Sequence, residues 1–549
     1  MGLHPQPVKF GFMLDKSPSR DTEFTSNSIV YLNAPAQPEI STDHGRFVAG
    51  EAFFNYGAMG GLRDGLEPVE LISKEYGGLL VNASVTGFVF MFFQYIFQVL
   101  LLADFSTTQH AQSNATKYLL QWPGAFSVFF GLISDCYPIY GSRRKSYMVL
   151  GWSVASVMFL TMVIVCATTA PADVTRGYLL LAFSMLASFG LQIAYIAALA
   201  MSVGLAQREC LYQRGHLQGL YLVVYYVFAN VAQIVAAVIF QRDDFGITMT
   251  SSISLLQAAA ILAGLCIVPI PFVVYRIHED IAQIHDVTFM RRVMELWQLL
   301  RWKVVYNILF FLCASLFLSA AFDSNVGTAM AFWSGITANT AGWIKVSEFL
   351  ARFLGVLIFK TVFINYSWRR LAIIGLISNV VAKVIMGGPI IYDVVRNPWY
   401  MCIMTLVSDV YLGVFDIFAL VIPTEIADVG REGAVIGLVS SFTVLISIAT
   451  YTLWAFVSSA AGARVDVVAI IVDLDETRQK VLIIGAVYIV INMLALGSPF
   501  FVPNQKLDAQ QLRAFGGYNH FGRLSIVAAF VVLVIYCLVA NVLEIVKES

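Results

Sequence analysis

The chain has 549 residues, of which 58% are hydrophobic and only 13% are charged. Soluble domains carry charges at about 25% of their positions, so the composition excludes an ordinary soluble protein. The net charge of -1 provides no basic footprint for nucleic acid. Apolar runs of about 18 residues or more, long enough to cross a ~30 Å hydrocarbon core as a helix, recur along the chain. We therefore expect an all-α, multi-spanning membrane protein.

Cysteine and histidine give no sign of a metal centre. The seven cysteines are scattered in or beside apolar runs, without a C-x-x-C pair, and none of the seven histidines falls inside such a run. Metal sites usually show these ligands at short, regular spacing. A nucleophile with a neighbouring base is not recognisable either. We therefore expect no metal, no cofactor and no enzymatic activity.

The order of apolar and polar segments divides the chain into five parts. Residues 1–75 are polar and are expected to lack a signal peptide and to be cytosolic. Six spans are expected in 76–275, a polar cytosolic linker in 276–303 and six further spans in 304–503. The C-terminal segment, 504–549, contains a thirteenth apolar run. The runs lie at approximately 76–103, 116–135, 147–169, 177–204, 217–240, 252–275, 304–329, 342–362, 370–392, 399–423, 433–459, 480–502 and 522–545.

Lysine and arginine gather in alternate loops, which predicts the orientation of the chain in the membrane. Arg143, Arg144 and Lys145 follow the second span, and the linker and the loop after the eighth span are also basic. Because cytosolic loops carry the excess of positive charge, these loops and the N-terminus are expected to be cytosolic. The plasma membrane is the expected location. Asn114-Ala-Thr116 would then lie outside, as a candidate glycosylation site.

The loop between the second and third spans indicates more than orientation. Asp135 stands at the end of one span, Pro138 and Gly141 make the turn, and basic residues begin the next span. The segment from Phe359 to Arg370 is the counterpart of this loop in the second group of six spans, so the chain contains a coarse internal repeat. Two six-span halves joined by a linker, together with this loop, resemble the major facilitator superfamily, in which a cavity lies between the halves.

Two motifs are specific enough to suggest a family. The motifs are Ser134-Asp135, Pro138-Ile139 and Gly141-Ser-Arg143-Arg144-x-x-Tyr147, and then Pro423-x-x-Ile-Ala-x-x-Gly-Arg431-Glu432-Gly433 with Ser440-Ser441-Phe442. Both resemble segments of the folate-biopterin transporter family, and the likeness in span order covers roughly 76–503. The resemblance implies transport of folates, pterins or, in some members, S-adenosylmethionine. A small-molecule substrate and the lipid bilayer are therefore the expected partners.

Ionisable residues inside apolar spans are energetically costly and therefore indicate a functional site. They are concentrated in the second half, at Asp323, Lys345, Glu348, Arg352, Lys383, Asp409 and Asp416. Arg352 and Asp409 lie ten residues below the outer starts of their spans, and Lys383 lies nine below the outer end of its own. At ~1.5 Å per residue, all three are expected roughly 15 Å deep, near the midplane where such transporters bind substrate.

The residue types suggest a role for each charge. Arg352, with Lys345, would bind a carboxylate, because the planar guanidinium can hold both oxygens. An aspartate would accept a coupling proton or the amino group of a pteridine, since burial favours the protonated form of a carboxylate. We predict substrate binding by Arg352, Asp409, Lys345, Asp323 and Lys383, and coupling by Asp416 and Glu348.

Most of these charges also have a purely structural alternative. Arg352 and Asp409 could form an ion pair that only holds two spans together. Lys345 and Glu348 are three residues apart and could be a local pair on one helix. Lys383 lies in a span that is usually peripheral in the superfamily, so it could serve packing alone.

The loop after the second span also predicts a gate. Asp135 is expected to pair across to neighbouring spans and to lock the outward-facing state, while Arg143 and Arg144 hold the cytosolic ends. Glu432, at the start of the eleventh span, belongs to the same predicted gate. The alternative is orientation alone, for which any three cations would serve. The aspartate at a defined spacing from glycine and the basic cluster exceeds that need and favours the gate.

Together these features predict a monomeric secondary transporter that works by alternating access. The favoured substrate is a folate, a pterin or a similar heteroaromatic solute, with protons as the candidate coupling ion. The flat ring could stack on one or two of the aromatic residues in the spans, although most of these are expected to face lipid or to lie in the membrane interface. They include Phe92, Phe93, Tyr95, Tyr225, Tyr226, Trp333 and Trp343. One alternative is the same fold carrying S-adenosylmethionine, whose sulfonium would favour the aspartates over Arg352. Another is a receptor or scaffold that does not transport, although such a protein has no need of midplane charges.

Overall fold

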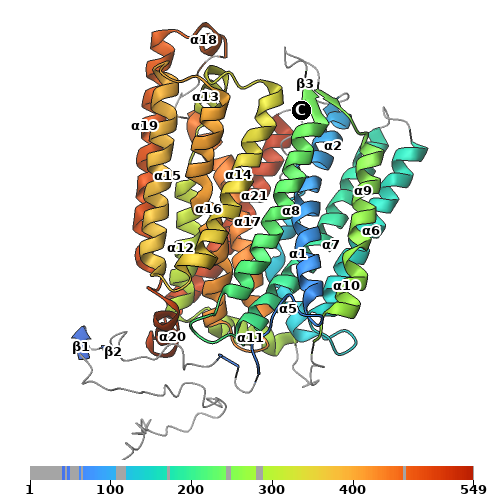
Figure 1. Ribbon diagram of the computed structural model, residues 1–549, viewed down its shortest axis with the longest axis vertical. Coiled ribbons are helices and arrows are strands. Elements are labelled where there is room, and N and C mark those ends of the chain that lie inside the picture. Colours follow the sequence, from blue (N-terminus) through green and yellow to red (C-terminus); the bar gives the residue numbers. More distant parts are fainter. Residues whose placement is uncertain are drawn as a thin grey trace, which may run out of the picture.

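The helices run side by side between two ends in the computed structural model of the protein (Figure 1). The structure describes residues 40–43, 46–49, 61–63, 66–106, 119–169, 174–242, 249–279, 289–460, 465 and 467–547. The predicted glycosylation site at Asn114 and most of 1–75 lie outside these residues. The predicted all-α, multi-spanning fold is confirmed.

The secondary structure is almost entirely helical. Before the linker the helical elements are α1 (Gly77–Phe92), the π-helical η3 (Phe93–Phe97), α2 (Gln98–Ser106), α4 (Trp122–Ala125), α5 (Ser127–Cys136), α6 (Lys145–Thr168), α7 (Val174–Ala206), α8 (His216–Ile239), α9 (Leu255–Ile267) and α10 (Pro269–Arg276). The linker contains α11 (Phe289–Leu299). Two short antiparallel hairpins complete this part, β1 (Ile40–Asp43) with β2 (Arg46–Ala49), and β3 (Phe240–Arg242) with β4 (Met249–Ser251).

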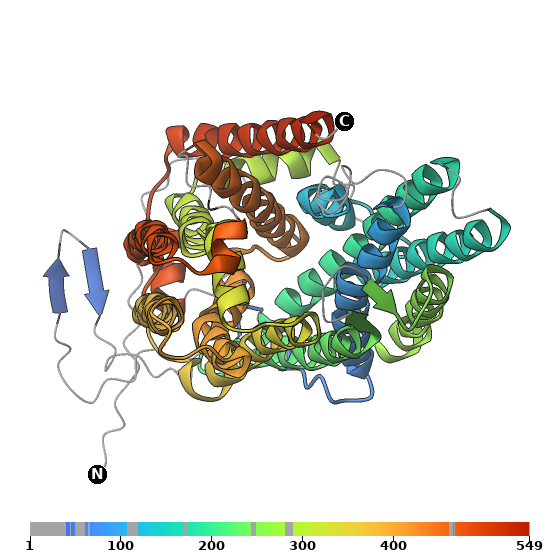
Figure 2. The same ribbon diagram turned by 90° about the horizontal axis from the view of Figure 1, so that it is seen from above.

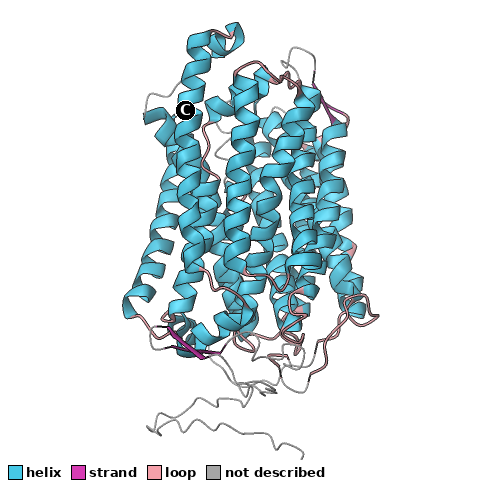
Figure 3. Cartoon of the chain, turned by 60° about the vertical axis from the view of Figure 1, so that its left-hand side comes forward, coloured by secondary structure: helices cyan, strands magenta, loops and turns pink. Residues whose placement is uncertain are grey.

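The second group of helices follows the linker. Its elements are α12 (Lys303–Ser319), α13 (Ser324–Trp333), α14 (Ala338–Ile358), the π-helical η5 (Phe359–Phe363), α15 (Trp368–Ile391), α16 (Pro398–Ile426), α17 (Glu432–Ala460), α18 (Val467–Val472), α19 (Asp475–Leu494), the 3-10 helix η6 (Ala495–Phe501), α20 (Lys506–Phe515) and α21 (His520–Lys547). Figure 3 shows these helices as long rods whose connecting loops lie mostly at the two ends.

Ten helices in the described residues are long and apolar enough to cross a membrane. The three other predicted spans are helical as well, but each departs from a plain apolar helix. The second span contains the ten-residue α5, which the short α4 precedes. The eighth, α14, carries Lys345, Glu348 and Arg352. The seventh is divided into α12 and α13.

The break in the seventh span corrects the expectation of one continuous helix over 304–329. Asp323 has an extended backbone, and its Oδ1 accepts hydrogen bonds from the backbone N–H groups of Asn325 (2.8 Å) and Val326 (3.0 Å). An aspartate in this position satisfies the free N–H groups at the start of a helix. Asp323 is therefore the N-cap of α13.

Two close helix crossings connect the first group of helices to the second. α5 packs on α17, and α8 packs on α14. At the α5–α17 crossing, a Cβ added to Gly131 would lie 1.9 Å from the backbone oxygen of Gly433. Val128 of α5 also donates its N–H to the hydroxyl of Ser441 (2.9 Å). The glycines thus permit an approach that any side chain would prevent.

The two ends of the helices differ in the loops that they carry. We call the end with loops 137–144, 207–215, 364–367 and 427–431 the basic end. Helices α11 and α20 also lie at this end, whereas α18 and the β3–β4 hairpin lie at the opposite end (Figure 1). The basic end is the one predicted to face the cytosol.

The last helix, α21, forms the predicted thirteenth apolar run. It packs on α12 and α17 at the edge of the second group (Figure 2). Cys537 of α21 is fully buried in a cluster with Leu445 and Ile448 of α17 and Trp122 of α4. This helix therefore lies beside the α5–α17 crossing.

Candidate functional site

An ion pair between Arg352 and Asp416 lies midway along the spans. Nη1 of Arg352 is 3.2 Å from Oδ2 of Asp416, so the pair joins α14 to α16. Tyr226 of α8 donates its hydroxyl to the same carboxylate oxygen. The side chains of Arg352 and Asp416 are 31% and 25% exposed. Both groups of helices therefore contribute to this charged site, whose side chains are partly exposed.

The partner of Arg352 differs from the one considered from the sequence, which was Asp409. Asp409 lies two turns from Asp416 on the same face of α16 and is partly exposed. Its charge interacts with those of Glu348, Arg352 and Lys383. In the described part of the chain, however, Asp409 takes part in no ion pair. Its carboxylate therefore lies near the Arg352–Asp416 pair but does not bind Arg352.

Lys345 and Glu348 form the local pair that their spacing allowed. Nζ of Lys345 is 2.7 Å from a carboxylate oxygen of Glu348, one turn apart on α14. Arg352 lies a further turn along the same helix. The three side chains accordingly form one charged face of α14, as their spacing predicted.

Lys383 and Asp323 bind neighbouring helices rather than the Arg352–Asp416 pair. Nζ of Lys383 donates to the backbone oxygen of Ser319 and to Oδ1 of Asn492, both at 2.7 Å. These contacts join α15 to α12 and α19. Asp323 caps α13, as described above, and its side chain is buried. The contacts of Lys383 favour its packing alternative, and Asp323 has a structural contact that the sequence did not suggest, as the cap of α13.

A buried ionic cluster closes the basic end. It consists of Asp135, Arg144, Glu432 and Arg63, and we call it the basic-end cluster. Arg144 binds Asp135 and also Glu432, the latter at 3.1 Å, and Arg63 binds Glu432. The side chains of Asp135, Arg144 and Glu432 are only 1%, 7% and 4% exposed. Charges this deeply buried require partners, and here the partners come from different helices.

Asp135 also binds the first turn of α17. Its carboxylate accepts hydrogen bonds from the backbone N–H groups of Ala434 (2.7 Å) and Gly433 (3.3 Å). A helix N-terminus favours an anion, because its first N–H groups have no partner within the helix. The carboxylate at the end of α5 is thus tied to α17, which is the contact across spans that the predicted gate requires.

Arg63 was not anticipated from the sequence. Its Nε donates to Oε1 of Gln207 (3.1 Å), and the backbone N–H of Leu62 donates to the backbone oxygen of Gln207 (2.8 Å). Gln207 in turn donates to the backbone oxygen of Ala427 (2.9 Å). Arg63 and Glu432 are separated by 369 residues. A polar segment before the first span gives no signal for so distant a contact.

Glu279, after α10, holds the start of α6. Its carboxylate accepts hydrogen bonds from the backbone N–H groups of Arg143 (2.9 Å), Arg144 (3.0 Å) and Lys145 (2.8 Å). The guanidinium of Arg143 lies next to Gly430. Among the described residues Arg143 forms no ion pair, whereas Arg144 is central to the basic-end cluster. The two arginines of the predicted gate therefore differ in their contacts.

A second buried ion pair reinforces the basic end. Arg214, before α8, binds Glu425 of α16 at 2.9 Å, and the two side chains are 1% and 0% exposed. Gln510 of α20 donates to the same glutamate (2.7 Å). Lys506 of α20 donates to the backbone oxygen of Leu211 (3.1 Å). α20 thus contacts both groups of helices.

Two buried groups at the basic end have pKa values shifted towards neutrality. Burial raises the pKa of Glu209 to about 7, although its carboxylate accepts hydrogen bonds from the backbone N–H groups of Gly215 (2.8 Å) and Leu217 (2.9 Å). Burial lowers the pKa of Lys506 to about 8. Both residues lie outside the membrane-spanning helices, so their protonation can follow the pH of the solution.

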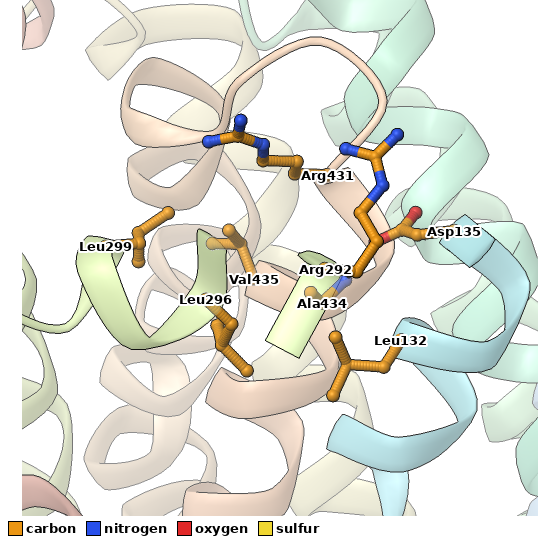
Figure 4. A pocket seen from close by; sticks show the side chains of 8 residues that line it. All are labelled: Leu132, Asp135, Arg292, Leu296, Leu299, Arg431, Ala434 and Val435. Carbon is orange, nitrogen blue, oxygen red and sulfur yellow. The ribbon is translucent and has the colours of Figure 1, made fainter. Parts of the chain in front are cut away.

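A small pocket adjoins the basic-end cluster. Its walls come from α5, α11 and α17 and include Asp135 (Figure 4). Arg292 of α11 and Arg431 beside α17 both line it, and both bind Glu295 of α11, at 2.9 and 3.2 Å. The linker helix is therefore attached to the loop that precedes Glu432.

The described residues contain no group of three or more histidine, cysteine, aspartate or glutamate side chains that could hold a metal ion. The charged side chains instead pair with one another, in the Arg352–Asp416 pair and at the basic end. This arrangement places one partly exposed ion pair among the spans and a set of buried ion pairs at the basic end.

Comparison with known proteins assigns the chain to a family. The model of the BT1 family matches residues 87–507, which is most of the chain. The chain belongs to the BT1 family, the folate-biopterin transporter family. No curated protein matches it. The matched region contains both sequence motifs and the Arg352–Asp416 pair, whereas Arg63, nearly all of α20 and all of α21 lie outside it.

The family resemblance seen in the two motifs is therefore confirmed. BT1 family proteins are transporters rather than enzymes. The apolar helices make this chain an integral, multi-pass membrane protein. Its partners are consequently a small-molecule substrate and the lipid bilayer.

Proposed function

We propose that this BT1 family protein carries a folate- or pterin-type solute across the membrane by alternating access, with protons as the coupling ion. Residues 76–275 and 304–503 form the two moving halves, and 276–303 link them. The basic end faces the cytosol, as the excess of Lys and Arg in its loops indicates. The plasma membrane is the proposed location.

The proposal rests on a difference in exposure between the basic-end cluster and the Arg352–Asp416 pair. The basic-end cluster around Asp135 and Arg144 is almost fully buried and joins α5 to α17. The Arg352–Asp416 pair, farther from the basic end, remains partly exposed. A reachable site with one end closed by polar contacts is what an outward-facing transporter requires. Opening the basic end would require Asp135 to release α17.

The Arg352–Asp416 pair suggests how the solute and the proton are coupled. A solute carboxylate would take the place of Asp416 on Arg352, because the guanidinium can hold two carboxylate oxygens. Asp416, once released, would take up a proton rather than remain an unpaired charge in the spans. Lys345 and Glu348 would meet the solute earlier on its path. Asp409 would accept an amino group of the ring.

One observation favours S-adenosylmethionine as a second candidate. Arg352 is already neutralised by Asp416, whereas Asp409 takes part in no ion pair within the described residues. A solute that carries a positive charge would supply the missing partner of Asp409. In this alternative the sulfonium would lie near Asp409 and the Arg352–Asp416 pair would remain intact.

Uptake into vesicles that contain the purified protein tests the proposal. Labelled folate, biopterin and S-adenosylmethionine are offered with and without a proton gradient. We expect uptake of folate or biopterin, stimulated by an inward proton gradient. Uptake of S-adenosylmethionine alone would favour the second candidate, and binding of a solute without uptake would indicate a receptor. Uptake of none of the three would refute the substrate class.

Substitution of Arg352 tests the role of this residue in folate uptake. Arg352→Ala should abolish folate uptake at normal protein abundance, and Arg352→Lys should restore only part of it, because lysine lacks the planar fork. Lys480→Met is the matched control, since Lys480 is exposed and pairs with Glu476 on the surface of α19. Full folate uptake by Arg352→Ala would contradict the role of this residue.

A further inference from the structure

Tyrosines from the first group of helices face the charged pair. Tyr226 and Tyr225 lie on α8 with ring centroids 5.1 Å apart, and Tyr195 of α7 is 6.2 Å from Tyr225. Tyr95 of η3 meets Phe349 of α14 edge to face, with ring centroids 5.9 Å apart. Rings from four helices thus lie around one arginine.

The charged side chains reach these rings directly. The guanidinium of Arg352 stands 5.7 Å from the centroid of the Phe349 ring. Tyr225 interacts electrostatically with Asp416 and Arg352, and Tyr95 interacts with Lys345 and Arg352. The tyrosines and the charges are therefore parts of one site, to which α14 and α16 supply the charges.

Three of the four hydroxyl groups have no hydrogen-bond partner in the part of the chain that the structure describes. Tyr226 donates to Asp416, but among the described residues no group bonds the hydroxyls of Tyr95, Tyr195 or Tyr225. Nor are these three oxygens among the enclosed polar atoms that lack partners, so the protein does not fully enclose them. A tyrosine hydroxyl inside a protein usually finds a partner. Here three hydroxyls are available to a ligand.

The backbone at Tyr95 is unusual in the same place. Residues Phe93–Phe97 form one π-helical turn between α1 and α2. Such turns are rare and are frequently found at functional sites, because the extra residue changes the direction of the side chains. The π-turn therefore marks the part of the first span that carries Tyr95 towards Phe349.

We infer that Tyr95, Tyr195 and Tyr225 form a subsite for the flat ring of the solute, which we call the tyrosine subsite. The hydroxyls bond the nitrogen and oxygen atoms on the edge of the ring, and the aromatic rings pack on it. The charged part of the same solute lies at Arg352 and the aspartates. The solute thereby touches both groups of helices, so its binding can be linked to their relative movement. This inference rests on the proposed transport of a heteroaromatic solute.

Removal of single hydroxyl groups tests the tyrosine subsite. Tyr95→Phe, Tyr195→Phe and Tyr225→Phe should each raise the KM for the transported solute by roughly two- to tenfold, the cost of one hydrogen bond. Tyr221→Phe is the matched control, because Tyr221 lies on α8 one turn from Tyr225 and is fully buried. Its KM should equal that of the wild type at equal surface abundance.

A competition experiment distinguishes failure of the tyrosine subsite from misfolding of a variant and from failure of the proposed function. Unlabelled pterin, which has the ring but no carboxylate, should inhibit uptake by the wild type and by Arg352→Lys. It should inhibit the three tyrosine variants less. Unchanged KM values and unchanged inhibition in all three variants, with the wild type active, would overturn the subsite. A wild type that takes up no heteroaromatic solute would instead refute the proposed function.

Discussion

Asp135 has three donors, which come from two other parts of the structure. The guanidinium of Arg144 binds it from the start of α6, and the N–H groups of Gly433 and Ala434 bind it from α17. A buried carboxylate is stable only with such partners. The motif that begins with Ser134-Asp135 therefore describes a contact between helices, in addition to a loop that orients the chain.

Asp135→Asn should abolish uptake at normal surface abundance. Asparagine can accept one backbone hydrogen bond, but it leaves the buried Arg144 with Glu432 as its remaining carboxylate. Breaking a buried ion pair in this way costs about 3–5 kcal/mol, enough to change the balance between closed and open states. Asp393→Asn, at an exposed aspartate of the opposite end that pairs with Arg396, is the control and should transport normally. Full uptake by Asp135→Asn would contradict the gate.

Glu209 should make the stability of the protein depend on pH. Its pKa is raised from an ordinary value of 4.5 to about 7 by burial, so between these values the folded protein holds a proton that the unfolded chain releases. The contribution of Glu209 to the free energy of unfolding is therefore fully present below about pH 4.5 and is lost as the pH rises through 7. It amounts to at most about 3 kcal/mol.

Thermal unfolding of the purified protein between pH 5 and pH 8 measures this effect. The wild type should lose stability as the pH rises, and Glu209→Gln should lose less. Glu476→Gln, at an exposed glutamate of the opposite end, should behave as the wild type. The same slope in the wild type and in Glu209→Gln would show that Glu209 is not responsible.

At the scale of elements, the crossing of α5 and α17 depends on the absence of side chains. Gly131→Ala would place a Cβ 1.9 Å from the backbone oxygen of Gly433, and overpacking of this kind typically costs about 1–3 kcal/mol. We expect lower thermal stability and reduced uptake. Gly264→Ala, in α9, is the control because an added Cβ meets nothing within 4 Å among the described residues. Equal stability of the two variants would argue against the close crossing.

The positions of the helices could be predicted from hydrophobicity, but the pairing of the charges could not. Counting residues from the span ends placed Arg352 and Asp409 at one depth, yet Arg352 binds Asp416. Depth counted along a chain ignores how long and how tilted each helix is, and α16 has 29 residues. Asp409 and Asp416 share a face, so only the relative height of α14 and α16 decides between them.

Asp323 and Arg63 show two further limits of prediction from the sequence. Asp323 lies inside an apolar run, and hydrophobicity alone does not reveal that the helix breaks before it. Arg63 reaches Glu432 from a polar segment 369 residues away. Glu432 and Asp135, in contrast, could be selected, because both belong to motifs of the BT1 family.

At the scale of the whole molecule, polar contacts between the two groups of helices gather towards the basic end. Asp135, Arg144 and Glu432 form one layer, and Arg214 with Glu425 forms another. α20 binds residues on both sides of this closure, although nearly all of it lies outside the region matched by the family model. Transport by the proposed mechanism therefore requires that the basic end opens during each cycle.

The distance between spin labels at the basic end tests this requirement most directly. Cysteines that replace the exposed Tyr212 and Val429, in a chain without its seven native cysteines, carry the labels on either side of the closure. Without substrate we predict one short distance, and with transported substrate, or with Asp135→Asn, a second and longer one. The contradicting result is the same single distance without substrate, with substrate and in Asp135→Asn. It counts only if the labelled protein without the Asp135 substitution still takes up substrate.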